Sequence, residues 1–471
     1  MMKKILFFAL VFISTTSFSQ EMRLLKGAIT ENIVVSDSLK ETLSLYLPST
    51  FEVQKSWPVI FVFDMKGRGK ASVSMLVNAA EKEGYILASS DNVNDSLSIS
   101  KNVLIANRMF NALINIVPIA KNRTYTAGFS SGAMFASILP TFIKEIKGVV
   151  SIGASVGNIE ILNSKQTFQF IGIVNRSDYS FRDMLDTQQI LNKLKFSNQL
   201  LVFDDDRILP DVNTLASAFR MLTLTSMAKG DVVRNDSFIA ESYGQFLSKA
   251  NSFVSNDKPI LANYLLLDIK KVFNPLIDLD SLKISQKSLR RSASYKKANR
   301  SQNSYFLKES FLKGDYSYFL EEDIITYNYA NLGWWKYKME DLSKLDKSAT
   351  LYERQMSSRL RGYINALISD NIDFVSADKN VDLEALNLLY MIKTITDPLE
   401  FTSFLKIISI SSKMEDYGTA LFYLEELLKN GYTNKSELYE LENTALFRIT
   451  PEFNSLIEKY LKNARYEIIE Q

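Results

Sequence analysis

The 471-residue sequence contains no histidine and no cysteine. Without histidine, the chain lacks the imidazole that normally takes a proton from a catalytic serine near neutral pH. Without cysteine, it can form neither disulfide bonds nor thiolate metal sites, and it cannot carry a lipid on cysteine. An excess of one charge is also missing, because 55 Lys and Arg against 53 Asp and Glu give a net charge of +2. Composition therefore gives no electrostatic argument for nucleic-acid binding, and we expect none.

Long hydrophobic runs are absent as well. The apolar run at residues 5–13 is too short to cross a bilayer, which needs about 20 residues. Two lysines precede this run, and small residues at Ser17 and Ser19 follow it, a pattern typical of a cleavable secretory signal. We therefore expect residues 1–19 to be a signal peptide, the mature chain to be exported as a periplasmic or secreted protein, and no segment to span a membrane.

Short apolar runs alternate with helix-length segments between residues 42 and 229. Such runs are typical of strands that helices cover on both faces. The alternation predicts an α/β fold with a mostly parallel sheet and right-handed crossovers. The expected strands are 42–47, 59–63, 85–88, 124–127, 148–152, 168–174 and 200–203, and the expected helices are 71–83, 98–117, 131–145, 183–196 and 211–229.

A G-x-S-x-G motif, with glycines at Gly128 and Gly132, lies between the expected strand 124–127 and the helix after it. Strand, sharp turn and helix form the setting in which this motif presents a nucleophilic serine, here Ser130. The glycines leave room for a turn that strains the backbone of the serine. The same letters can also form an ordinary Gly-Ser turn between a strand and a helix.

With this motif in this setting, residues 20–229 resemble the α/β-hydrolase family, especially its esterase and dienelactone-hydrolase-like branch. The resemblance implies an oxyanion hole made by N–H groups of the loop after the third strand, at Met65 or Lys66, and of Ser131. It also implies that Asp178, just after a late strand, holds the position of the acid in the catalytic triad.

The family histidine is the part that this chain does not have. In the loop after the last expected strand, alignment on Pro210 puts Arg207 at the histidine position. Arginine has a pKa above about 12, so it cannot accept the proton of Ser130. The resemblance therefore implies the fold, while the substitution removes the standard chemistry. Arg207 either forms an ion pair with Asp178 beneath Ser130 or points into solvent.

Two other features could supply a catalytic base or a metal site. Lys66 could act as an unusual base for Ser130 if its pKa were depressed. The acidic run at 204–206 could recruit a hard cation such as Ca²⁺, or it could be a solvated acidic turn. We expect neither a metal nor a cofactor.

From residue 230 onward, strand-like runs disappear and helical spacing dominates. We expect a helical domain at 230–410 and a terminal unit at 411–471 that resembles a tetratricopeptide (TPR) repeat over 411–463, with an Ala-Leu-x-x-Leu helix and a Pro-x-Phe segment. Packed helical pairs of this kind usually present a surface to a peptide or protein. The alternative is that the helices only brace the α/β domain.

Two further segments of the helical region have competing interpretations. Residues 283–308 carry eight basic side chains and no acidic one. They could bind an anionic polymer, or form a solvated helix neutralised by downstream acids such as Glu309 and Asp323. Trp334 and Trp335 could form a carbohydrate platform or anchor a hydrophobic core.

Two functions are consistent with these observations. The first is an exported, catalytically degenerate hydrolase-like protein that binds a small ester or peptide in its pocket, or a protein partner on its helices. The second is a serine ester hydrolase with low activity or an unconventional base. The missing general base favours the first.

Overall fold

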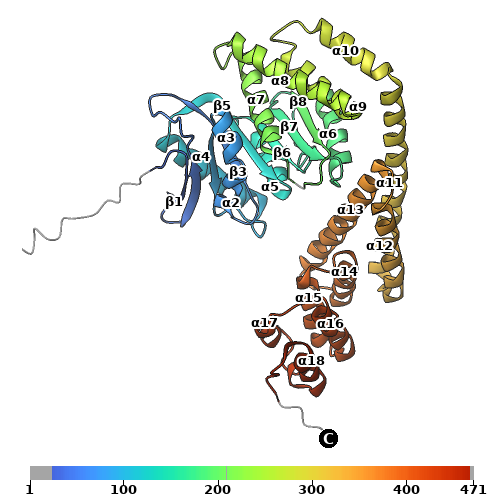
Figure 1. Cartoon of the computed structure of the whole chain (residues 1–471). Helices are drawn as coiled ribbons and strands as arrows, with labels where there is room; N and C mark the ends of the chain where they lie inside the picture. Colours follow the sequence, from blue (N-terminus) through green and yellow to red (C-terminus); the bar gives the residue numbers. More distant parts are fainter. Residues whose placement is uncertain (1–23, 208, 467–471) are drawn as a thin grey trace, which may run out of the picture.

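The computed structural model describes residues 24–207 and 209–466, so the expected signal peptide at 1–19 lies outside the described residues. An α/β region is built around one sheet, and an arm of helices leaves it along the long helix α11 (Figure 1). None of the helices in the described ranges has the length and apolarity needed to cross a membrane.

The eight strands of the sheet lie in the order β1-β2-β4-β3-β5-β6-β7-β8. β1 and β2 pair antiparallel, as do β2 and β4, whereas all neighbours from β4 to β8 are parallel. This confirms the expected mostly parallel sheet. The strands are β1 (Ile29–Ser36), β2 (Glu41–Tyr46), β3 (Trp57–Phe63), β4 (Ile86–Ser90), β5 (Ile119–Phe129), β6 (Ile146–Ile152), β7 (Gln169–Asn175) and β8 (Asn198–Phe203).

Strand β1 is not among the strands expected from the sequence. Its pairing with β2 shifts register twice, and Asn32 inside it has φ 55°. These irregularities break the period-two alternation by which a strand is recognised in a sequence.

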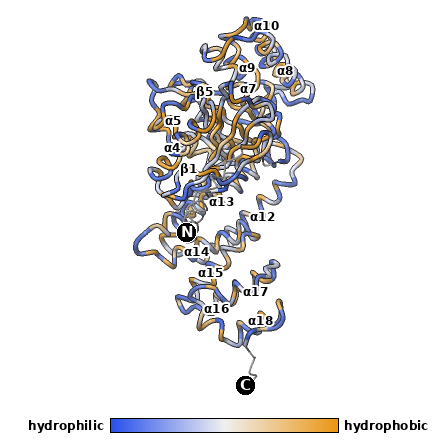
Figure 2. The backbone as a smooth tube through the Cα atoms, turned by 90° about the vertical axis from the view of Figure 1, so that its left-hand side faces the viewer, coloured by the Kyte–Doolittle hydropathy of each residue, from blue (hydrophilic) through white to orange (hydrophobic). Residues whose placement is uncertain are grey.

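Helices cover both faces of the sheet, as expected. Alternate residues of β3 point to opposite sides: Ile60 packs with α3 and α7, whereas Phe61 packs with α4 and α5. Figure 2 shows the hydrophobic segments gathered in the centre of this region. The helices are α2 (Gly69–Ser74), α3 (Val77–Glu83), α4 (Ile99–Ile116), α5 (Ser131–Phe142), α6 (Phe181–Lys193) and α7 (Val212–Lys229).

The hydrophobic core on the α3 and α7 side continues beyond residue 229. Helices α8 (Asp236–Ser255), α9 (Pro259–Phe273) and α10 (Asp280–Arg291) add buried side chains to it, including Phe246 and Phe273. Secondary structure changes where the sequence predicts it, since no strand of the described chain follows β8. The packing unit nevertheless includes α8 to α10 together with the sheet.

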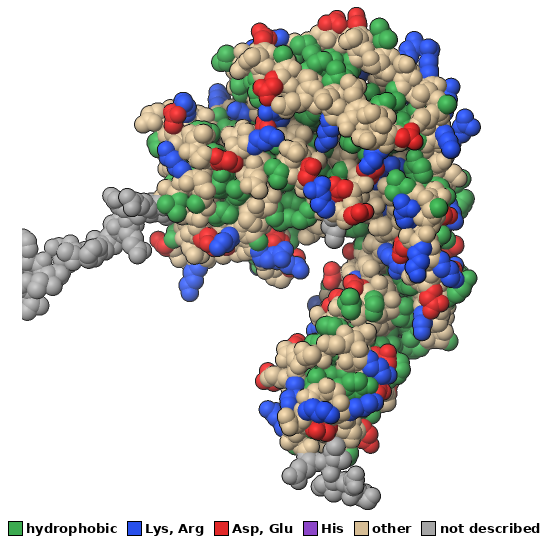
Figure 3. Space-filling view, in the orientation of Figure 1, with side chains coloured by type: hydrophobic (Ala, Val, Ile, Leu, Met, Phe, Trp, Pro, Cys, Tyr) green, Lys and Arg blue, Asp and Glu red, His purple; other side chains and the backbone are tan. Residues whose placement is uncertain are grey.

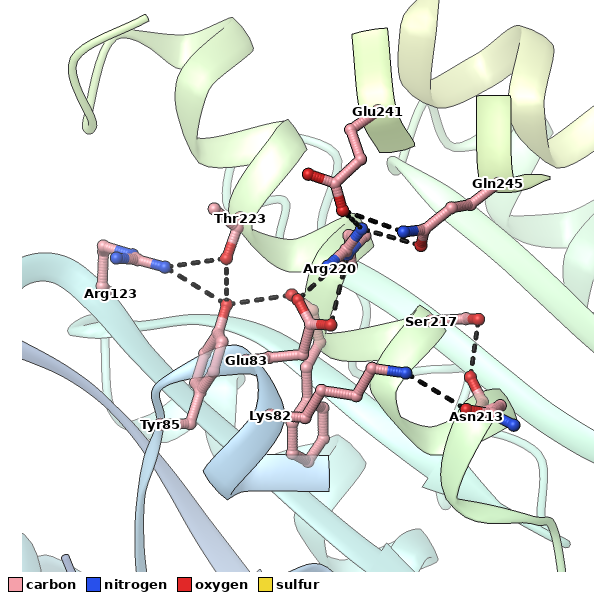
Figure 4. Close-up of polar contacts among 11 residues, drawn as sticks. Lys82, Glu83, Tyr85, Arg123, Asn213, Ser217, Arg220, Thr223, Glu241 and Gln245 are labelled. Carbon is pink, nitrogen blue, oxygen red and sulfur yellow. Dashed lines mark hydrogen bonds and ion pairs between the residues drawn. The ribbon is translucent and has the colours of Figure 1, made fainter. Parts of the chain in front are cut away.

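Polar contacts also tie α8 to the α/β layers (Figure 4). Arg220 of α7 donates to Glu83 of α3 at 3.1 Å, to Glu241 of α8 at 3.2 Å and to Gln245 of α8 at 2.8 Å. One guanidinium thereby joins three helices, which fixes α8 on the face formed by α3 and α7.

The arm is entirely helical within the described residues. Trp335 is fully buried in the cluster formed by α11 to α14, and its Nε1 donates to Asp323 at 2.8 Å. It is a core anchor, whereas the terminal cluster of α14 to α18 keeps its TPR resemblance as a prediction. The elements are α11 (Ala293–Thr326), η1 (Tyr329–Asn331), α12 (Leu332–Asp346), α13 (Leu351–Ser376), α14 (Leu383–Thr396), α15 (Phe401–Lys413), α16 (Tyr417–Lys429), α17 (Lys435–Glu440), η2 (Phe447–Ile449) and α18 (Pro451–Leu461).

A buried polar joint connects the arm to the sheet. Arg359 of α13 pairs with Glu309 of α11 at 2.7 Å, and both side chains are 3% exposed. Arg359 also donates through Nη1 to the backbone oxygen of Arg176, just after β7, at 2.6 Å. Arg176 in turn donates to Gln302 of α11 at 2.9 Å and lies over the ring of Tyr352. The loop after β7 is therefore held by two helices of the arm.

We predict that Arg359→Met destabilises the protein by about 3 kcal/mol, because it leaves the Glu309 carboxylate buried with only Lys313, at 3.3 Å, as a partner. Chemical denaturation of the full chain measures the loss. The double variant Glu309→Leu/Arg359→Met should recover most of it, because both buried charges are then gone. A single variant as stable as wild type would contradict the buried pair.

A second buried charge lies behind the edge strand β8. Asp268 of α9 is 1% exposed, and its Oδ2 accepts the N–H of Leu200 at 3.1 Å. Burial raises the pKa of Asp268 from 3.8 to about 7, even though Lys271 nearby acts to lower it. The folded protein therefore binds this proton more tightly than the unfolded chain does.

This pKa shift predicts that Asp268 makes folding less favourable as the pH rises. Its contribution to stability is fully present below 3.8 and is lost as the pH rises through about 7. Asp268→Asn keeps an acceptor for Leu200 but does not titrate, so its unfolding free energy should rise relative to wild type across that interval. Parallel curves for the two proteins would exclude the shift.

Candidate functional site

The turn formed by the G-x-S-x-G motif, here called the elbow, adopts a strained geometry rather than that of an ordinary turn. Ser130, between β5 and α5, has φ 50° and ψ −121°, a conformation rare for residues other than glycine. A Cβ on Gly128 would lie 2.4 Å from the backbone of Gly132, and one on Gly132 would lie 2.1 Å from the backbone oxygen of Phe63. Both glycines are therefore required by close backbone contacts.

The Ser130 side chain stands at the carboxyl end of the parallel strands. Its own N–H donates to the oxygen of Ile152 at the end of β6, at 2.9 Å. Ser130 and the next residue, Ser131, are exposed, and the Ser130 hydroxyl does not cap α5. The position and exposure of Ser130 agree with the nucleophile role that the resemblance implies, and that role stays a prediction.

The loop after β3 lies against the elbow, as the resemblance implies. The N–H of Lys66 donates to Asp64 Oδ1 at 3.1 Å, so in this structure it is not free to bind an oxyanion. The physical reason is an Asx turn, in which the carboxylate binds the N–H two residues on. For Met65, only the backbone oxygen is engaged, by the N–H of Asp95 at 2.8 Å. The oxyanion roles of Met65 and Ser131 stay predictions.

Asp178 lies in the loop after β7, as expected, but half of its carboxylate is engaged locally. Its Oδ1 accepts both the N–H and the hydroxyl of Ser180 at 2.8 Å, just before α6. Its Oδ2 would lie 3.5 Å from a Cβ on Gly153, the residue after β6. Asp178 is thus at the strand ends, where it also organises the start of α6.

Arg207 follows β8 but does not pair with Asp178, so that hypothesis is wrong within the described residues. Its guanidinium contacts Asp205 at 2.5 Å and Asp211 at 3.7 Å, two acids close to it in sequence. The hydrogen bond to Asp205 raises the pKa of Arg207 further. Its side chain is 59% exposed, which agrees with the alternative that Arg207 points into solvent, although it also pairs with acids of its own loop. In this conformation, the residue that the resemblance puts at the position of the base is a cation tied to its own loop.

The alternative chemical groups are not arranged for catalysis or metal binding. Asp204 pairs with Lys258 at 2.7 Å while Asp205 pairs with Arg207, so the carboxylates of the acidic run point to different partners. Across the part of the chain that the structure describes, no acidic cluster could hold a metal ion. Lys66 is exposed, which leaves it without the burial that would activate a lysine.

A pocket of about 390 Å³ lies where the loops after β7 and β8 meet α13. Figure 3 shows the surface hollowed between the α/β region and the arm. Gly362 lets α13 approach closely, since a Cβ there would lie 3.0 Å from Tyr179. Ser130 is not part of the lining that the structure describes. The pocket is lined by Asn175, Ser177, Asp178, Tyr179, Asp205, Asp206, Arg207, Ser358 and Gly362.

The contribution of α13 to this pocket was missed by the sequence reasoning. Ser358 and Gly362 are far in sequence from the strands whose loops they meet, and only the folded arm brings them there. A glycine inside the long helix α13 was the one available signal, because an interior helical glycine often marks a close contact.

No protein-family model and no curated protein matches this chain. Solved structures match about two fifths of this chain. Est1E from Butyrivibrio proteoclasticus is 11% identical with a TM-score of 0.34, over 42% of this chain and 99% of that one. Dienelactone hydrolase from Anabaena variabilis ATCC 29413 is 13% identical with a TM-score of 0.33, over 42% and 97%. A chain from Bacteroides ovatus ATCC 8483 is 13% identical with a TM-score of 0.34, over 42% of this chain and 34% of its own length.

The sheet topology and the serine turn define the fold of this protein. A mostly parallel sheet begins with two antiparallel pairings, and the strained serine turn follows β5 and opens α5. Candidate acid and base positions follow β7 and β8. The protein has an α/β-hydrolase-like fold followed by a helical region.

Proposed function

We propose that this protein is an exported, catalytically degenerate α/β-hydrolase-fold protein that binds a ligand or partner. One observation carries the proposal: Arg207, which the resemblance puts at the position of the general base, is paired with Asp205 and Asp211, in a chain without histidine. A guanidinium cannot take the serine proton, so Ser130 has no standard route to activation.

The surroundings of the acid position support a binding role. Ser180 occupies one oxygen of Asp178, and the backbone two residues earlier, at Arg176, is held by Arg359 of the arm. A loop that served catalysis would need to meet a histidine and a substrate. This one instead meets the arm and helps to form a pocket under α13.

The pocket between the β7 and β8 loops and α13 is the proposed ligand site. Its charged side chains are three carboxylates, Asp178, Asp205 and Asp206, and one guanidinium. Of the small ester or peptide ligands suggested by the fold, this charge balance favours a peptide that carries an amine. The hydrogen-bonding groups of Asn175 and Ser177 would orient it.

A protein partner on the arm is the second part of the binding proposal. A groove of about 540 Å³ lies between η1 and helices α12, α14 and α16, and the 59% exposed Phe422 is one of its lining side chains. Such an exposed aromatic ring beside a groove is typical of a docking site for an apolar anchor residue.

The proposed export rests on the sequence of residues 1–19 and the absence of cysteine. N-terminal sequencing of the protein recovered outside the cytoplasm tests it.

A serine ester hydrolase remains the second candidate, because the elbow is intact. Ser130 keeps a strained backbone and an exposed side chain, features that serve nucleophilic attack. This candidate needs a base other than histidine, and Lys66 is the one on the neighbouring loop.

We predict that a fluorophosphonate probe labels the wild-type protein no more than it labels Ser130→Ala, because no group deprotonates the serine. Arg207→His supplies an imidazole at the base position and should raise labelling, and Arg207→His/Ser130→Ala is its control. In-gel fluorescence measures the signal. Wild-type labelling that disappears in Ser130→Ala would overturn catalytic degeneracy, and Lys66→Met would then test the alternative base.

We also predict that the pocket prefers cationic peptides. Calorimetric titration with a lysine-containing tripeptide should show binding that weakens with salt, while its glutamate counterpart should not bind. Asp206→Asn should weaken binding about fivefold, the equivalent of roughly 1 kcal/mol for an exposed ion pair. Asp378→Asn, an exposed acid outside the pocket lining, is the matched control. Equal binding of both peptides would exclude charge selection.

A further inference from the structure

The outward face of α11 carries a line of exposed apolar side chains. Leu307 is 59% exposed, Phe311 67%, Tyr318 62% and Ile325 70%. Their spacing of four and then seven residues puts them on one side of the helix, in the manner of a helix-pairing seam. Single exposed apolar residues are common, but several on one face of one helix are typical of an interaction surface.

Within residues 24–207 and 209–466, no other element covers this face. The buried residues of α11 lie on its other side, where it packs against α13 and α9. In Figure 1, α11 forms the outer edge of the arm. The inward-facing buried residues are Gln302, Phe306, Glu309, Tyr316, Leu320 and Asp323.

Gly314 interrupts the apolar line at its middle, between Phe311 and Tyr318. A glycine inside a helix costs up to about 1 kcal/mol relative to alanine. Nothing in the described structure lies within 4 Å of a Cβ placed there, so no internal packing requires it. The missing side chain leaves a notch on the outward face, of the kind into which a facing helix inserts a large residue.

Charge is divided along the same face. Toward its N-terminal end, Lys297, Arg300 and Lys308 are exposed, and basic side chains gather along α10 and the start of α11 (Figure 3). Toward its C-terminal end, Glu321 and Glu322 are exposed. One half of the face is therefore the electrostatic complement of the other half.

The acids expected to neutralise the basic segment include two that do not face it. Glu309 is buried against Arg359, and Asp323 accepts hydrogen bonds from Asn331 and Trp335. The explanation of a solvated helix balanced by neighbouring acids is thus weaker in the folded protein than in the sequence.

We propose that a second copy of this chain docks along α11 in antiparallel orientation, with the two-fold axis near Asp315. In that arrangement, Leu307 meets Ile325 of the second copy, and Tyr318 fills the notch at its Gly314. Lys308 then faces Glu322 of the other copy, twice by symmetry. Parallel pairing would instead set Lys308 against Lys308. Asp315 meets its own copy near the axis, where both carboxylates are exposed and the repulsion is screened.

The first test is the oligomeric state of the purified protein by sedimentation velocity over a range of concentrations. Wild type should form dimers, and Phe311→Glu/Tyr318→Glu should be monomeric with an unchanged circular dichroism spectrum, because both side chains are exposed in the monomer. Phe374→Glu, at an 81% exposed position on α13, is the matched control and should stay dimeric. A monomeric wild type, or a dimer that survives the double substitution, would overturn the proposal.

A charge exchange tests the orientation. Lys308→Glu and Glu322→Lys should each weaken the dimer about tenfold, since each creates two like-charge contacts worth roughly 0.5–1 kcal/mol apiece. The double variant Lys308→Glu/Glu322→Lys should restore wild-type affinity, because the reversed pairs attract again. Additive weakening in the double variant would exclude the antiparallel arrangement.

Gly314→Leu distinguishes the proposed contact at the notch from the effect of glycine on helix stability. It should stabilise the isolated helix yet weaken the dimer, because the leucine occupies the space proposed for Tyr318 of the second copy. Sedimentation at equilibrium measures the dissociation constant. An unchanged or tighter dimer would rule out the notch as a contact point.

Discussion

The arrangement of the two regions depends on one buried ion pair. Glu309 and Arg359 are removed from water together, and Arg359 also donates through Nη1 to the backbone oxygen of Arg176 after β7. Isolated, either charge would be costly in this setting, so α11 and α13 must pack together for the pair to form, and the loop after β7 adds an acceptor for Arg359. The buried ion pair and the packing of the arm therefore stabilise each other. The loop after β7 is part of the same contact.

The side chains at the strand ends show why a hydrolase-like sheet need not imply hydrolysis. The strand ends still present Ser130 in its strained turn, and Asp178 still follows β7. Around them, Asp205 and Asp211 fix Arg207, and Ser180 engages Asp178. The fold supplies positions, whereas chemistry requires particular side chains at those positions.

The parallel sheet and the elbow could be predicted from the sequence because each depends on residues that are close together in the chain. Apolar runs mark the buried strands, and two glycines flank Ser130 because the neighbouring backbone approaches closely. The partners of Arg207 were not predictable in this way, since a flexible guanidinium chooses among several nearby carboxylates. The role of α13 was also hidden, because Ser358 and Gly362 reach the pocket through tertiary packing alone. Strand β1 was missed because Asn32 and its register shifts erase the alternation.

Gly362 makes the pocket a contact between the α/β region and the arm. The same stretch of α13 that carries this glycine lines the pocket and lies near the buried ion pair. A ligand held in the pocket would therefore touch the loops after β7 and β8 and the arm at the same time. Its binding energy would be added to the contact between the two, so occupancy of the pocket would stabilise the arm on the sheet.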